Sequence, residues 1–288
     1  NRIGVFGMMV SVAETVKKKL TIEDVDALTG TLIGRPKSAT FRTADVVGLD
    51  TMAYVANTAF DKCDDDESRD MFKIPDFLQK MLDNEWLGQK SNQGFYKKIE
   101  KGVIHSLDFD TMEYTPQNKK RFSGIGLARE NTTVDGKLIA LINAPDIAGE
   151  FTWEVFSQTL IYAANRLGEI ADDIVNIDRA LCWGFGWRKG PFEIWDMLGL
   201  KQTVNRMKED RKNIPKWIDK MLSAGCESFY KIENGIKYFY DYKKGEYVAF
   251  DANEKELSFS SIKYNGALIN KNWSASIVDL GDEVAGVE

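Results

Sequence analysis

Apolar residues recur every three or four positions along much of this chain, and this spacing predicts helices. Three long stretches show it, at residues 2–19, 41–60 and 151–168. Between the first two, residues 29–40 contain glycines and a proline, which interrupt helices and predict a loop. The pattern therefore favours a mainly helical protein.

Shorter segments alternate apolar and polar residues and predict small β-hairpins. One hairpin is expected from strands 95–99 and 103–107, with a further short strand at 112–114. Another is expected from strands 229–232 and 236–240, which surround an Asn-Gly pair typical of a two-residue turn.

Two helix starts carry recognisable capping signals. Thr21 precedes Glu23 and Asp24, so it should cap a helix whose acidic first turn suits the helix dipole. Pro75 suits the first position of another helix, which is expected to run to about Leu87.

The chain contains the same sequence pattern twice. Residues 26–50 share their Asp, Leu, Gly, Phe and Gly-Leu positions with 178–201, residues 74–82 return as 214–222, and residues 94–97 return as 228–231. A period of about 140–150 residues is far longer than that of a solenoid, so each copy should be a domain.

These patterns divide the chain into five parts. The expected division is a first helical domain at 1–115, a linker at 116–135, a second and degenerate copy at 136–250, a linker at 251–275, and the start of a further domain at 276–288. The last part alternates around Gly281 and Asp282, which predicts a hairpin.

Composition narrows the class of protein. Hydrophobic residues make up 43% and charged residues 28%, which is typical of a globular protein, and a net charge of −6 argues against a nucleic-acid partner. No segment is long and apolar enough to predict a membrane span. The three cysteines are widely spaced, so we interpret them as reduced thiols of a cytoplasmic protein.

Common catalytic motifs are missing from the sequence. It has no GxGxxG, GxSxG, Walker A or HExxH pattern. Its one histidine, His105, falls in the first predicted hairpin and is expected to be a surface strand residue. The acidic run at 63–67 lacks the spacing of a calcium loop, so we interpret it as a solvated loop and expect no metal.

Several motifs in order resemble a known family. They are Asn1-Arg2 before an apolar helix, the segment 21–26, the segment 41–51, and Gly94-Phe95-Tyr96. Together they resemble the C-terminal helical domain of NAD-dependent 3-hydroxyacyl-CoA dehydrogenases. Residues 189–193 fit the family's loop in the second copy, and residues 276–285 resemble the opening of an enoyl-CoA hydratase (crotonase) domain.

This resemblance implies a fold and a set of partners. The fold would be two tandem helical domains of the 6-phosphogluconate dehydrogenase C-terminal type, each followed by a small β-hairpin. Family members with two copies are multifunctional fatty-acid β-oxidation proteins. NAD would be bound by an upstream Rossmann domain that is not in this chain, and a crotonase domain would follow downstream.

The resemblance also implies a reaction, the oxidation of (3S)-3-hydroxyacyl-CoA to 3-oxoacyl-CoA with NAD. A His–Glu pair of the Rossmann domain would remove the proton, so this chain alone is expected to be inactive. Asn1 matches the family's catalytic-site asparagine, and the alternative role for Asn1 is a helix N-cap. The acyl-CoA substrate is expected to contact four residues: Val5, Met8, Pro36 and Phe41.

Other residues carry weaker expectations. Asp45 and Asp196 are expected to cap helices or hold loops, without a catalytic role. Residues 36–41 lack the family's usual Gly-Pro, which leaves the preferred acyl chain length open. The second copy has Phe151-Thr152-Trp153 where the first has Asn1, so it should be structural and pack on the first through its long helix.

Two other functions remain open at this point. The chain could be a non-catalytic helical module for dimerisation or interaction. It could also belong to a dehydrogenase of similar architecture that acts on a different hydroxy acid.

Overall fold

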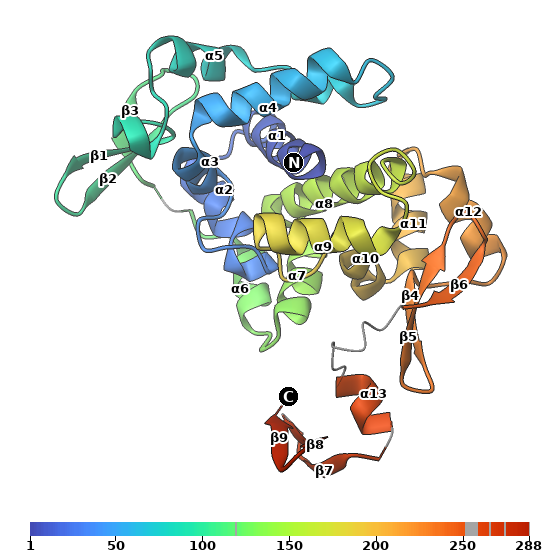
Figure 1. Ribbon diagram of the computed structural model, residues 1–288. Coiled ribbons are helices and arrows are strands. Elements are labelled where there is room, and N and C mark those ends of the chain that lie inside the picture. The colour runs from blue at the N-terminus through green and yellow to red at the C-terminus, as the bar shows by residue number, and fades with distance from the viewer. Residues whose placement is uncertain (119, 251–258, 265, 274, 288) are drawn as a thin grey trace. The chain divides into compact units, whose positions relative to one another are not determined.

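The computed structural model describes residues 1–118, 120–250, 259–264, 266–273 and 275–287, and it is mainly helical, as the sequence predicts (Figure 1). The chain forms two compact units. One comprises Asn1–Leu167 and Ile177–Leu198, and the other comprises Gly168–Asn176 and Gly199–Glu288. This division differs from the expected one, because helices of both repeated segments belong to the first unit.

The first unit contains most of the helices and one small sheet. In chain order its elements are α1 (Arg2–Lys17), α2 (Ile22–Thr29), η1 (Thr31–Ile33), α3 (Phe41–Val47), α4 (Leu49–Lys62), η2 (Arg69–Phe72), α5 (Asp76–Asp83), η3 (Gln89–Ser91), β1 (Tyr96–Glu100), β2 (Val103–Leu107), β3 (Tyr114–Pro116), α6 (Ser123–Arg129), α7 (Val134–Ile142), α8 (Ile147–Asn165), most of α9 (Ile174–Phe185) and α10 (Pro191–Leu198).

The long helices α1 and α8 lie side by side at the centre of this unit (Figure 1). Phe6 of α1 stacks on Tyr162 of α8, with ring centroids 3.8 Å apart and planes 7° from parallel. Gly7 allows the close approach, because a Cβ there would lie 3.3 Å from the Thr159 hydroxyl. The predicted packing of the two long helices is therefore confirmed.

The predicted helix at 41–60 is in fact two helices. Gly48 separates α3 from α4 and has a φ of 102°, which only glycine adopts readily. The helix predicted from Pro75 to Leu87 is also shorter, since α5 ends at Asp83 and Glu85 has a positive φ of 59°. Both differences come from backbone turns that the apolar spacing does not reveal.

The segment 116–135, which was expected to be a linker, contains helix α6, and α7 begins at Val134. Asp146 explains why this polar segment folds, since its carboxylate caps α8 at Gly149 and also accepts hydrogen bonds from Ser123 and Gly124, both at 2.8 Å. Asp146 thus holds the start of α6 in place, although the segment around α6 is mostly polar.

The predicted hairpin of the first unit is confirmed as β1 and β2, and the third strand lies two residues later than expected. His105 of β2 pairs with Lys97 on one side and Pro116 on the other. It is half-buried, and its Nδ1 atom lies 3.3 Å from the Tyr114 carbonyl oxygen, so it is less exposed than predicted.

The second unit has its own helices and two small sheets. Its elements are α11 (Leu200–Glu209), α12 (Lys216–Ser223), β4 (Tyr230–Glu233), β5 (Ile236–Asp241), β6 (Glu246–Ala249), α13 (Phe259–Tyr264), β7 (Leu268–Lys271), β8 (Ser276–Gly281) and β9 (Val284–Val287). The predicted hairpin is confirmed as β4 and β5, and both turn residues, Asn234 and Gly235, have positive φ angles.

The segment 251–275, which was expected to be a linker, lies partly outside the described residues, at 251–258. The remainder contains α13 and β7. The predicted hairpin around Gly281 is confirmed as β8 and β9, and β7 extends it to three antiparallel strands.

The two repeated segments share a specific capping interaction. The Asp26 carboxylate accepts the backbone N–H groups of Phe41 and Arg42, at 2.7 and 3.1 Å, at the start of α3. The Asp178 carboxylate accepts those of Phe192 and Glu193, at 2.9 and 3.1 Å, at the start of α10. The repeated aspartate and aromatic positions therefore have the same local structure.

A matched pair of glycine substitutions tests the packing between α7 and α8. A Cβ at Gly149 would lie 2.1 Å from the Ala144 carbonyl oxygen, whereas nothing lies within 4 Å of one at Gly126 in α6. Gly149→Ala should lower the free energy of unfolding by about 1–3 kcal/mol, as overpacking does. Gly126→Ala should leave it unchanged or raise it by up to about 1 kcal/mol. Urea denaturation measures both, and equal effects would contradict this packing.

Candidate active site

The start of α1 brings Asn1 to the surface. Asn1 occupies the N-cap position and its carbonyl accepts the Val5 N–H at 2.9 Å, but its side chain makes no capping hydrogen bond. Asn1 is exposed. Its side-chain amide is therefore not occupied by the role that a capping residue normally performs.

The next residue, Arg2, is fixed by a carboxylate that lies far away in the sequence. The Arg2 guanidinium contacts Asp66 at 2.6 Å through Nη2 and donates from Nε to the Tyr162 hydroxyl at 2.8 Å. The Tyr162 hydroxyl in turn donates to Asp66 at 2.6 Å. These three side chains form a closed hydrogen-bonded triangle between α1, α8 and the loop after α4.

Arg166 at the end of α8 completes this cluster. Its Nη1 atom lies 3.4 Å from the Asp66 carboxylate, and its Nη2 atom is paired with Glu67. Glu67 also accepts a hydrogen bond from Asn165 at 2.8 Å. We call Arg2, Asp66, Tyr162 and Arg166 the Asp66 cluster.

The interpretation of residues 63–67 as a solvated loop is wrong for Asp66, whose side chain is 0% exposed. Burial would raise the pKa of this carboxyl, but hydrogen bonds from Tyr162, Arg2 and the Ser68 N–H, with the charge of Arg166, hold it below its ordinary value. Asp66 is thus a buried anion. Its local sequence gives no sign of this, because the side chains of Arg2 and Tyr162 that bind it are 64 and 96 residues away.

The four residues expected to bind substrate lie in different environments. Met8 is half-buried, Pro36 is exposed and Val5 is 6% exposed. Phe41 is 0% exposed, and its ring packs on Phe95 with centroids 4.7 Å apart. Phe41 is therefore part of the core in this structure, because its backbone is held by Asp26 beneath the loop.

Phe185 lies against α1, and the next residue, Gly186, lies against Pro36. The Phe185 ring lies directly over Gly4, where a Cβ would be 2.1 Å from the ring. The neighbouring Gly186 approaches Pro36, whose Cγ would be 3.2 Å from a Cβ there. The end of α9 thus lies between the loop and the first turns of α1.

Arg35, next to Pro36, has an unusual environment. Its guanidinium lies over the ring of Trp187 at 4.2 Å and that of Phe156 at 5.2 Å. Its Nε and Nη2 atoms are buried without a hydrogen-bond partner among the described residues. Burial lowers the pKa of Arg35 to about 10. Aromatic faces, rather than a carboxylate, hold this cation.

Two other buried aspartates hold loops. Asp45 accepts the N–H groups of Phe95 and Tyr96 at 2.8 and 2.9 Å, which confirms its predicted role. Asp26 accepts the Tyr96 hydroxyl at 2.9 Å in addition to the cap of α3. Burial raises the pKa of each carboxyl to about 6, despite these hydrogen bonds.

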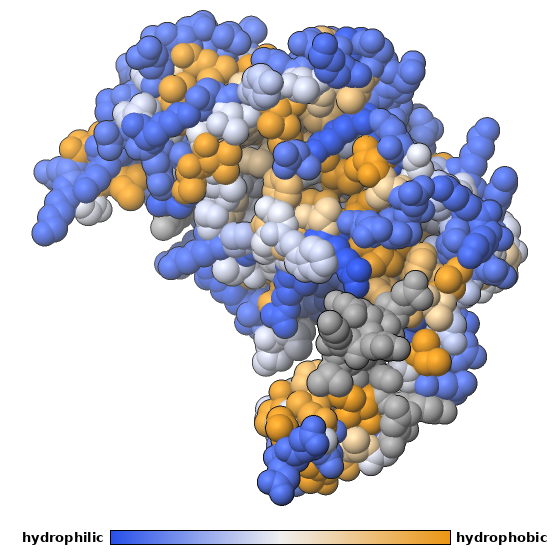
Figure 2. Space-filling model, in the orientation of Figure 1, coloured by the Kyte–Doolittle hydropathy of each residue, from blue (hydrophilic) through white to orange (hydrophobic). Residues whose placement is uncertain are grey.

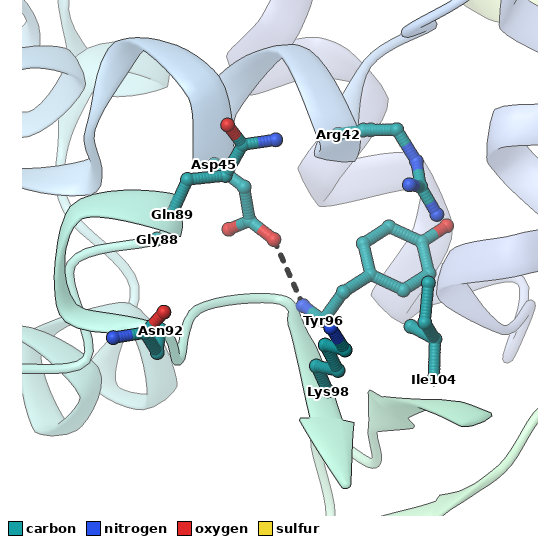
Figure 3. A pocket seen from close by; sticks show the side chains of 8 residues that line it. All are labelled: Arg42, Asp45, Gly88, Gln89, Asn92, Tyr96, Lys98 and Ile104. Carbon is teal, nitrogen blue, oxygen red and sulfur yellow. Dashed lines mark hydrogen bonds between the residues drawn. The ribbon is translucent and has the colours of Figure 1, made fainter. Parts of the chain in front are cut away.

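A pocket of about 350 Å³ lies beside Asp45 (Figure 3). Its lining comes from α3, from the loop around η3 and from the hairpin: Arg42, Asp45, Gly88, Gln89, Asn92, Tyr96, Lys98 and Ile104. Arg42 extends over the Tyr96 ring, 4.7 Å from its centre. This pocket contains none of the residues predicted to bind substrate.

Residues 1–98 match the family model for the C-terminal domain of 3-hydroxyacyl-CoA dehydrogenase. This match includes Asn1, the Asp66 loop and the pocket-lining residues up to Lys98. The resemblance drawn from the sequence motifs is therefore supported for this part of the chain.

Two relatives have names that refer to 3-hydroxyacyl-CoA dehydrogenase or to fatty acid oxidation. A probable 3-hydroxyacyl-CoA dehydrogenase of Bacillus subtilis (strain 168) is 47% identical over 100% of this chain and 36% of its own length. A putative fatty acid oxidation complex trifunctional enzyme of Rickettsia prowazekii (strain Madrid E) is 24% identical over 67% of this chain and 26% of its own length. The chain thus spans about a third or less of these relatives.

Among solved structures, the crystal structure of 3-hydroxybutyryl-CoA dehydrogenase from Escherichia coli K12 aligns with a TM-score of 0.45 and 15% identity. It covers 77% of this chain and 60% of that chain.

The surface is largely hydrophilic on the face seen in Figure 2. None of the helices in the described part of the chain has the length and apolar character needed to cross a membrane. Within the same residues, no group of three or more His, Cys, Asp or Glu side chains is arranged to hold a metal ion.

Removing one hydroxyl tests the Asp66 cluster. Tyr162→Phe keeps the ring that stacks on Phe6 but removes the hydrogen bonds to Arg2 and Asp66. The free energy of unfolding should fall by about 1–3 kcal/mol, because a buried charged group loses a donor. Tyr54→Phe is the matched control, since Tyr54 is 73% exposed, and should change it by less than about 0.5 kcal/mol. Equal effects in guanidinium denaturation would contradict the cluster's role.

Proposed function

We propose that these 288 residues form the substrate-side helical part of a 3-hydroxyacyl-CoA dehydrogenase. The reaction would be the oxidation of (3S)-3-hydroxyacyl-CoA to 3-oxoacyl-CoA with NAD, in cytoplasmic fatty-acid β-oxidation. The observation that carries this proposal is the family match over residues 1–98, which begins at Asn1. The exposed and uncapped side chain of Asn1 supports it from the structure.

The chain's own residues do not fit NAD. The sheets of the described residues are small and antiparallel, whereas a dinucleotide site uses a parallel strand, a glycine-rich turn and a helix. We therefore assign NAD to a Rossmann domain elsewhere in a longer polypeptide, and we assign the acid–base chemistry to that domain as well. A crotonase domain after residue 276 belongs to the same proposal.

Within that scheme, Asn1 binds and orients the reacting oxygen. Its side-chain amide can donate to the 3-oxygen of the substrate and accept from a catalytic imidazole, which favours a single reactive geometry. Arg2 is held by Asp66 and Tyr162, so the backbone next to Asn1 is fixed. Met8 and Pro36 would then form part of the acyl wall, with Val5 behind them, while Phe41 supports the loop from the core.

We further propose that the second repeated segment is a degenerate copy that packs on the first within one chain. The shared aspartate caps support common ancestry of the two segments. The packing of α8 on α1 supports a structural role for the second. Its residues Tyr162 and Arg166 reach the Asp66 cluster, so this copy would also help to position Asn1.

Substitution of Asn1 distinguishes a role in the active site from a role as a helix N-cap. In the longer polypeptide, Asn1→Ala should lower kcat by roughly 10- to 1000-fold, as loss of a positioned polar group at a reacting centre does. Asn1→Ser keeps a good capping residue but removes the amide, so it should not restore kcat. Unfolding free energies should change by no more than about 1–2 kcal/mol. Near-normal kcat in either variant would overturn the assignment.

The 288 residues alone should have no dehydrogenase activity, because the described residues form no dinucleotide fold. The assay is NADH formation from 3-hydroxybutyryl-CoA, with the longer polypeptide as the positive control. Turnover by the isolated chain would refute the proposal. An inactive longer polypeptide would instead favour a non-catalytic interaction module.

A further inference from the structure

We propose that the pocket beside Asp45 binds the phosphate-bearing end of a small molecule. This site is separate from the residues assigned to the dehydrogenase reaction, and the inference does not depend on the proposed function. Two cations lie here without ion-pair partners among the described residues, close packing fixes the backbone of the walls, and the volume suits a small anion.

The two cations are Arg42 and Lys98. No hydrogen bond or ion pair engages either side-chain charge among the described residues, although the chain as a whole has a net charge of −6. Nearby Lys90 differs, because Asp50 holds it at 2.5 and 2.6 Å. Cations that no ion pair holds on the wall of a pocket attract an anion.

The one acidic residue of the lining is Asp45, and its carboxylate is hydrogen-bonded to the backbone. Asp45 is 4% exposed, and its carboxylate accepts two N–H groups from Phe95 and Tyr96, which compensate its charge. The charge of Arg42 helps to lower the pKa of Asp45, but no hydrogen bond or ion pair joins Asp45 to Arg42 or Lys98 among the described residues.

The walls are held in place by very close packing around Asp45. A Cβ at Gly88 would lie 2.3 Å from the Asp45 carbonyl oxygen, and one at Gly94 would lie 2.2 Å from its carboxylate. Between these glycines lie Gln89 and Asn92, which line the pocket (Figure 3) and whose exposed side-chain amides are neutral donors. Close packing therefore fixes the backbone that carries these donors, which lowers the entropic cost of binding.

The lining also indicates the chemical class of the ligand. A guanidinium, an ammonium and amide groups together match an oxyanion with several oxygens, as in phosphate esters. The volume of about 350 Å³ exceeds that of a bare phosphate and falls at the lower end of small-molecule sites. Tyr96 and Ile104 add an apolar wall, so the ligand should carry an organic part next to its phosphate.

Titration of the purified chain with inorganic pyrophosphate and with adenosine 3′,5′-bisphosphate tests the inference. At constant ionic strength, the side-chain amide signals of Gln89 and Asn92 in ¹H–¹⁵N spectra should shift and saturate with one Kd for each probe. Tighter binding of the nucleotide assigns the organic part to a nucleoside. Equal binding assigns the site to the phosphate groups alone, and both results support a phosphate site.

Charge-neutral variants supply the control. Arg42→Gln and Lys98→Gln should each weaken binding by roughly 10-fold or more, the loss expected for one charge-assisted contact. Lys101→Gln removes the same charge from the exposed hairpin turn outside the pocket and should leave Kd unchanged. Absence of saturable binding below 10 mM (about −2.7 kcal/mol) overturns the proposal, and so does an equal loss in all three variants.

Discussion

The buried carboxylate of Asp66 joins three segments that the sequence keeps far apart. It contacts Arg2 at the start of α1, Tyr162 and Arg166 at the end of α8, and the Ser68 N–H in its own loop. A buried anion is costly unless it is fully paired, so loss of one partner costs more than the pair itself contributes. The Asp66 carboxylate therefore helps to hold the start of α1 against the end of α8, beside the stacking of Phe6 on Tyr162.

Buried aspartates serve mainly as structural acceptors in this protein. Asp26 and Asp178 cap equivalent helices, Asp45 fixes the loop before β1, and Asp146 ties α6 to α8. Each carboxylate accepts at least two hydrogen bonds, which hold a helix start or a loop in place.

The sequence predicted the elements whose signals are local. The apolar spacing predicted α1 and α8, Thr21 predicted the N-cap of α2, and the Asn-Gly pair predicted the turn between β4 and β5. It did not predict the break at Gly48 or helix α6, because those depend on a backbone turn and on a cap from Asp146. Asp66 was missed for a similar reason, since its burial is decided by Arg2 and Tyr162, 64 and 96 positions away. Asn1 was found only through a family motif.

The contacts of Arg35 with aromatic rings and the contacts of the Asp66 cluster respond differently to pH. The Asp66 cluster contributes stability only while its carboxyl is ionised, so that contribution is present above the ordinary aspartate pKa of about 3.9 and is lost in more acidic solution. Arg35 stays protonated at every pH below about 10, and neither Trp187 nor Phe156 carries a titratable group. Acid therefore weakens the contacts that hold the start of α1 to α8, whereas it does not neutralise the cation that packs against Trp187 and Phe156.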